Sequence, residues 1–133
     1  MQNSALEKFQ VERVAHFQYD FAKYGGTAGD IVLTDDVIPD DALITRGALQ
    51  VKTALVGSGA SVALKVNTAE DVLAATAITS MDGIGDLLVV VPVPQTASTW
   101  IKTAAKKNLT MTISAAALTA GKFEVFLAYF MGD

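Results

Sequence analysis

Apolar and polar residues alternate most regularly in residues 36–66, and this alternation predicts a long strand with one face in the core. Every second position of residues 43–55 belongs to one face, whose large apolar members are Leu43, Leu49, Val51 and Leu55. A period of two residues is typical of a half-buried strand. Gly57 and Gly59 come next, and glycine takes the positive φ of a tight turn without strain.

The apolar alternation resumes at Val62, Leu64 and Val66, so the stretch predicts a glycine hairpin with a returning strand. Such a hairpin is not stable alone in water, because its apolar face needs further strands to cover it. The same alternation recurs at spacings of roughly ten residues. It predicts further strands at residues 11–22, 31–33, 87–93, 99–103, 109–114 and 122–131.

Two of these strands have distinctive patterns. The β-branched content of residues 87–93 predicts a buried strand, and Pro92 and Pro94 place its end at a sheet edge. Residues 122–131 are apolar on both faces near their end. That pattern is typical of a strand in the centre of a sandwich or at a subunit contact.

The number and spacing of the strands predict an all-β fold. Asn67, followed by Glu70 and Asp71, indicates one or two turns of helix at residues 67–75, and little other helix is expected. About eight short strands with at most one short helix predict an antiparallel β-sandwich or jelly roll. We expect an N-terminal arm at residues 1–10 and a single β-sandwich domain at residues 11–133.

Composition narrows the range of functions. Hydrophobic residues make up 51% of the chain and charged residues 18%, which excludes intrinsic disorder. The mean hydropathy of +0.38 is high for a small monomer and indicates that some surface is buried against a partner. The net charge of −4 argues against nucleic-acid binding. The longest apolar run, residues 87–93, is shorter than the ~20 residues that span a membrane. The charged N-terminus does not match a signal peptide, so we expect synthesis in the cytoplasm without a targeting signal.

No arrangement of residues predicts catalysis or a cofactor. There is no cysteine, and the one histidine, His16, has only Glu12 and Asp20 at even spacing on its strand face, which could equally be solvated. The acidic residues Asp35, Asp36, Asp40 and Asp41 could bind calcium or simply form a turn. The aromatic residues could form a sugar-binding platform or belong to the core. They are Tyr19, Phe21, Tyr24, Trp100, Tyr129 and Phe130.

Three segments together resemble a family of small virion structural proteins of tailed bacteriophages. They are DVIPDDALITRGALQVKTAL, SVALKVNTAEDVLAATAI and NLTMTISAAALTAGKFEVFLAYF. The resemblance implies a non-enzymatic capsid decoration, or cement, protein that binds the major capsid protein on the capsid surface. It also implies a homo-oligomer, with a trimer favoured. The alternative is a head fibre, knob or tail subunit that contacts host surface glycans. For a decoration protein, we expect oligomer or capsid contacts at Leu6, Phe9, Trp100, Phe126 and Phe130.

Overall fold

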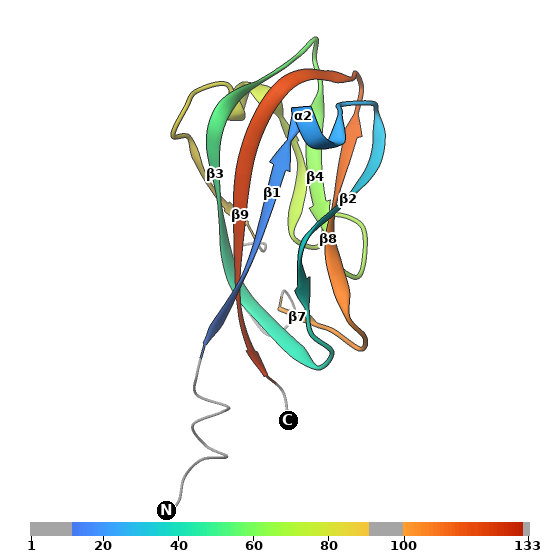
Figure 1. Cartoon of the computed structure of the whole chain (residues 1–133), viewed down its shortest axis with the longest axis vertical. Helices are drawn as coiled ribbons and strands as arrows, with labels where there is room; N and C mark the ends of the chain where they lie inside the picture. The colour runs from blue at the N-terminus through green and yellow to red at the C-terminus, as the bar shows by residue number, and fades with distance from the viewer. Residues whose placement is uncertain (1–11, 91–99, 132–133) are drawn as a thin grey trace, which may run out of the picture.

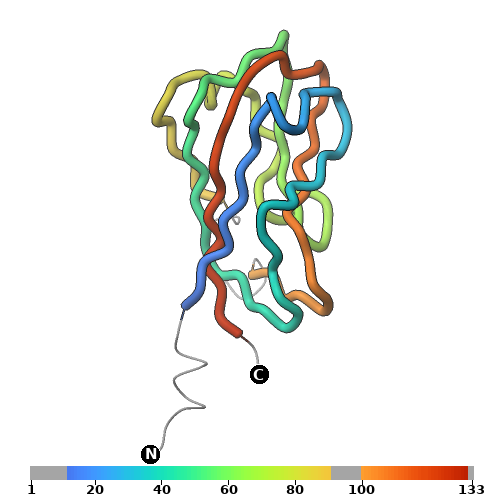
Figure 2. Tube along the Cα trace, viewed as in Figure 1, coloured from blue at the N-terminus to red at the C-terminus, as the bar shows by residue number. Residues whose placement is uncertain are grey.

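The computed structural model describes residues 12–90 and 100–131, most of which lie in two antiparallel sheets packed face to face (Figures 1 and 2). The five-stranded sheet contains β1 (Arg13–Asp20), β9 (Leu118–Met131), β3 (Ala42–Gly57) and β6 (Leu87–Val90) in that order, with β7 (Ile101–Lys102) also paired to β3. The four-stranded sheet contains β2 (Gly29–Ile38), β8 (Lys107–Ser114), β4 (Ser61–Lys65) and β5 (Leu73–Ala77). The predicted all-β sandwich is confirmed.

The first half of the chain pairs with the second half in a nested order. β1 pairs with β9, β2 with β8, β3 with β6, and β4 with β5, all antiparallel. The pairings of β3 with β9 and of β4 with β8 then join these pairs into the two sheets. Figure 1 shows β9 running between β1 and β3, as its apolar faces predict for a central strand.

The core lies between the sheets and is built from the alternate residues of each strand. Ala15, Phe17 and Tyr19 of β1 are buried, as the alternation of residues 11–22 predicts. Across from them the four-stranded sheet contributes Leu64, Met111 and Ile113. Burial of these side chains is the main force that holds the sheets together.

Strand β3 changes its inward face part of the way along. Leu49, Val51 and Leu55 are buried as predicted, but at the start of the strand Ile44 is buried and Leu43 is only half-buried. The register with β9 shifts between Ile44 and Arg46, and such an irregularity exchanges the two faces of a strand. The prediction that Leu43 faces the core is therefore wrong.

The predicted glycine hairpin is also wrong, because β3 and β4 lie in different sheets. The turn after β3 instead crosses from one sheet to the other, with Gly59 at a φ of 75°. A second connection, from β8 to β9, also crosses between the sheets. It passes close to this turn, because a Cβ on Gly57 would lie 2.7 Å from the carbonyl oxygen of Ala117. A hairpin and a crossing put the same alternate residues in the core, so the pattern alone does not separate them.

The helix predicted at residues 67–75 is absent from this described stretch. The Asp71 carboxylate instead accepts the N–H groups of Val66, Asn67 and Thr68 at 2.8–2.9 Å, which fixes a tight turn. Strand β5 begins at Leu73. The strand predicted at residues 11–22 ends at Asp20, because Phe21 begins a four-residue helix, α2 (Phe21–Tyr24). A short 3-10 helix, η1 (Ile78–Met81), follows β5.

Candidate functional site

The outer face of the five-stranded sheet carries apolar side chains in adjacent strands. His16, Phe126, Ala48 and Val89 form one row across β1, β9, β3 and β6 by register. Val14 and Ala128 lie in the row on one side, and Leu87 lies in the row on the other. We call the residues Val14, Ala48, Leu87, Val89, Phe126 and Ala128 the apolar face. Val14 is 56% exposed, Leu87 69%, Val89 65% and Phe126 38%.

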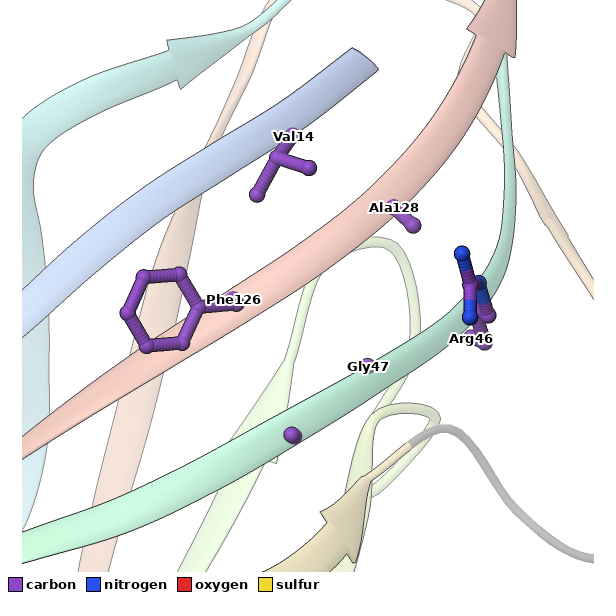
Figure 3. Close-up of a pocket in the computed structure, with 6 residues that line it drawn as sticks. Val14, Arg46, Gly47, Phe126 and Ala128 are labelled. Carbon is purple, nitrogen blue, oxygen red and sulfur yellow. The ribbon is translucent and has the colours of Figure 1, made fainter. Parts of the chain in front are cut away.

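One part of the apolar face is hollowed (Figure 3). The hollow has a volume of about 240 Å³ and is lined by Val14, Arg46, Gly47, Ala48, Phe126 and Ala128. Ala48 and Ala128 have small side chains and lie beside larger neighbours on this face, which leaves room for the hollow. The backbone of Gly47 forms part of its floor, and a Cβ on Gly47 would point into the core, 2.7 Å from the carbonyl oxygen of Phe126 and from Cγ2 of the buried Val90.

Several charged groups beside the apolar face are paired with one another. Glu124 Oε1 lies 2.6 Å from His16 Nε2, and Glu124 Oε2 lies 3.2 Å from Lys52 Nζ. Burial acts to raise the pKa of Glu124, but the hydrogen bonds from Lys52 and His16 outweigh it and hold the pKa below its usual value. Arg46, at the rim of the hollow, donates from Nε to Glu12 Oε2 at 3.0 Å. An uncharged partner could therefore cover this face without leaving these charges unpaired.

His16 has different partners from those that sequence reasoning gave it. Glu12 binds Arg46, and Asp20 accepts the N–H of Ala22 at the start of α2. The imidazole of His16 instead stacks on the ring of Phe126, with 4.7 Å between the ring centroids. Within residues 12–90 and 100–131, no group of three or more His, Asp or Glu side chains could hold a metal ion.

Three of the four acidic residues considered for calcium have separate structural roles. Asp35 and Asp36 lie within β2, and their carboxylates accept the N–H groups of Gln18 at 3.0 Å and His16 at 2.9 Å. They close the seam between β1 and β2, which would otherwise be an open sheet edge. Asp41, just before β3, forms an ion pair with Lys102 of β7. Burial acts to raise the pKa of Asp35, but hydrogen bonds from Tyr24 and Lys23 outweigh it and lower this pKa.

The aromatic residues do not gather into one platform. Tyr19 and Tyr129 are buried, and the Tyr24 hydroxyl donates to Asp35 Oδ1 at 2.6 Å. Trp100 is 39% exposed and directly precedes β7. The core interpretation therefore holds for most of this set.

The structure places three of the five predicted contact residues. Phe126 lies in the centre of the apolar face, and Phe130 is half-buried further along the same strand, paired in register with Leu43. Trp100 directly precedes β7. Lys102 of β7 pairs in register with Leu43 of β3, on the edge of β3 opposite β9. Leu6 and Phe9 lie outside the described residues, as do Pro92 and Pro94.

Sequence reasoning missed Val14, Leu87 and Val89. Val14 breaks the alternation of β1, and this break was the available signal. The prediction of a buried strand at residues 87–93 is wrong for Leu87 and Val89, because β6 is an edge strand with one face in the core and the other exposed.

No family model matches the sequence, and no curated protein is significantly similar to it. Several solved structures nevertheless share the fold. One is a chain of the acidic stable capsid of Helicobacter pylori bacteriophage KHP30, with a TM-score of 0.65, 15% identity, and coverage of 94% of this chain and 91% of that chain. Another is from the capsid of Ralstonia phage GP4, with a TM-score of 0.66, 17% identity, and coverage of 93% and 86%.

A third is from the capsid asymmetric unit of cyanophage Pam1, with a TM-score of 0.64, 14% identity, and coverage of 90% and 84%. At these identities the similarity establishes the fold alone. The resemblance to bacteriophage virion proteins that the sequence predicts is therefore confirmed at the level of the fold. No described helix is long and apolar enough to cross a membrane.

Proposed function

We propose that this protein is a structural component of a tailed-bacteriophage virion, and more specifically a decoration protein that binds the major capsid lattice and stabilises the head. The observation that carries the proposal is the fold shared, over at least 90% of the chain, with chains of three phage capsids. Those chains are themselves covered over 84–91% of their length. They are thus small chains of similar size, as a separate decoration subunit would be.

The strand order supports the same proposal. With the two-residue β7 set aside, the nested pairing of four strands with four strands is that of a jelly roll. Jelly rolls are common in viral capsid proteins. They also occur in lectins, so the fold favours a capsid role without requiring it.

The apolar face supports a role in assembly. An exposed cluster of this kind on a small protein marks an interaction surface, and its ionic groups are already paired. We propose contacts to the capsid or to other copies at Phe126, Phe130, Trp100 and the segment that holds Leu6 and Phe9. On a lattice, many weak contacts of one kind add up through avidity, so each can be modest. The role is structural, with no enzymatic step.

The alternative is a head fibre, knob or tail subunit that contacts host surface glycans. Its support from the structure is the exposed part of Trp100, because aromatic faces stack on sugars. The other candidate aromatics contribute mainly to the core and to the β1–β2 seam, which weakens this alternative.

Mixing the purified protein with capsids that lack it tests the proposal. Saturable binding at a fixed ratio to the capsid subunits, together with greater resistance of the capsids to heat, is the expected result. Binding to host cells or their polysaccharide, without binding to capsids, would instead identify a receptor-binding subunit.

A further inference from the structure

The hollow in the apolar face has the features of a site for an apolar side chain from another chain. Its walls are the side chains of Val14, Phe126 and Ala128, and its floor includes Gly47 (Figure 3). Contact sites that contribute most to binding are pockets of this kind, which take one large apolar anchor in the centre of a patch.

Two residues of the chain outside the described part match such a pocket. Residues 1–11, MQNSALEKFQV, are mostly polar but contain Leu6 and Phe9. Leu6 and Phe9 are three residues apart, so either an extended or a helical backbone can present one of them as an anchor. The segment joins the domain at Glu12, whose carboxylate binds Arg46 on the rim of the hollow.

The direction of the chain argues against binding within the same molecule. From Glu12 the chain runs along β1 towards Val14, so the hollow lies on the C-terminal side of Glu12 along this strand. Phe9 could reach its own hollow only if the chain reversed within three residues. Residues 7–12, EKFQVE, contain none of the glycine, proline, asparagine, aspartate or serine residues that favour a reversal.

We propose that the hollow binds the N-terminal segment of a second copy of this chain, with Phe9 or Leu6 as the anchor. Each copy then gives one segment and receives another. This head-to-tail contact closes into a ring when the rotation between copies allows it, as in the trimer that the resemblance implies. The inference supplies the contact for the homo-oligomer of the proposed function, and its test uses free protein without capsids.

The natural absence of cysteine makes disulfide mapping direct. A Phe9→Cys chain and a mass-tagged Ala48→Cys chain are unfolded, refolded together so that copies exchange, and oxidised; a Leu6→Cys chain is tested in parallel. We expect a mixed disulfide of about twice the 14.0 kDa chain mass. Val32→Cys is the matched control, because Val32 is 47% exposed on the outer face of the other sheet. It should give only background yield.

Two results would overturn the proposal. Equal yields with Ala48→Cys and Val32→Cys would show that the segment does not select the hollow. A disulfide that forms only within a chain carrying both Phe9→Cys and Ala48→Cys would assign the hollow to the segment of its own chain. Either result leaves the capsid-binding test of the proposed function unaffected.

A second test uses a substitution that fills the hollow. Ala48→Arg places a long side chain in it at an exposed position, and the solution mass measured by light scattering should fall from that of an oligomer to that of one chain. Val32→Arg should keep the mass of the unaltered protein. An unaltered protein that is already a single chain at high concentration, or an Ala48→Arg variant that keeps its oligomer, would contradict the inference.

Discussion

Both sheets have an apolar inner face, but the side chains on their outer faces differ in polarity. Outside, the five-stranded sheet presents Phe126, Ala48 and Val89 side by side. The four-stranded sheet presents hydroxyl groups on β8, where Thr112 Oγ1 donates to Asp30 Oδ1 at 2.7 Å and Lys65 Nζ lies 3.1 Å from Asp30 Oδ2. Folding requires an apolar inner face from both sheets, but it requires nothing of their outer faces. The difference between the outer faces therefore supports the proposed role in assembly, and it is the reason for placing the proposed contacts on the five-stranded sheet.

The largest effect is expected at the floor of the hollow. Gly47→Val should lower the free energy of unfolding by about 3 kcal/mol, because the new side chain overlaps the backbone of Phe126 and the side chain of Val90. Chemical denaturation measures the change. Ala48→Val, at the next and exposed position, should change stability by less than about 0.5 kcal/mol. Equal losses for both variants would mean that the close packing beneath Gly47 does not require glycine.

A charge on each outer face separates their roles. Val89→Lys should weaken capsid binding at least about tenfold, which corresponds to about 1.4 kcal/mol, because it places a charge in the apolar face. Val32→Lys changes a similarly exposed valine on the four-stranded sheet and should bind as the unaltered protein does. A binding titration measures both. If Val32→Lys weakened binding more, the assignment of the two faces would be reversed.

The seam between the sheets should weaken in acid. The folded state lowers the pKa of Asp35, so its contribution to stability is complete above the ordinary carboxyl pKa and is lost as the pH falls through the lowered value, below about pH 4. Asp35→Asn should cost about 1–2 kcal/mol at pH 7, because the carboxylate accepts bonds from Gln18, Tyr24 and Lys23. Unfolding curves at pH 7 and pH 3 check this. The difference between the variant and the unaltered protein should shrink at pH 3, and an unchanged difference would count against the seam.

The smallest effect compares one ion pair on each face. Lys52→Gln should cost more than Lys65→Gln, since the Glu124 side chain is 17% exposed and the Asp30 side chain 52%. Both costs should stay below about 1 kcal/mol, as for other pairs near the surface. Thermal unfolding at low and high salt measures them. A larger cost for Lys65→Gln would show that the apolar surroundings do not strengthen the Glu124 pair.

Much of the fold follows from the alternation of residues, because each strand needs one apolar face. The positions of Phe17, Leu49 and Val125 in the core were predictable for this reason. The partner of each strand was not, since pairing depends on contacts between distant residues, such as the register of Ala48 with Phe126. The hairpin predicted after β3 was wrong for the same reason, because the alternation does not say in which sheet the next strand lies.

The candidate site was predictable only in part. Phe126 stood out as an apolar residue on the wrong side of β9. Leu87 and Val89 did not, because an apolar strand reads the same whether it is buried on both faces or lies at an edge with one face exposed. His16 gained its carboxylate partner from a strand 108 residues away, and no local spacing indicates such a contact.

The central claim is that the outer face of the five-stranded sheet makes the contacts of assembly. An electron cryomicroscopy map of capsids saturated with the protein tests it most directly. The account predicts that Phe126, Ala48 and Val89 are covered by the capsid or by a neighbouring copy, while Thr110 and Thr112 face solvent. A map in which the four-stranded sheet is covered and the apolar face is open to solvent would contradict it.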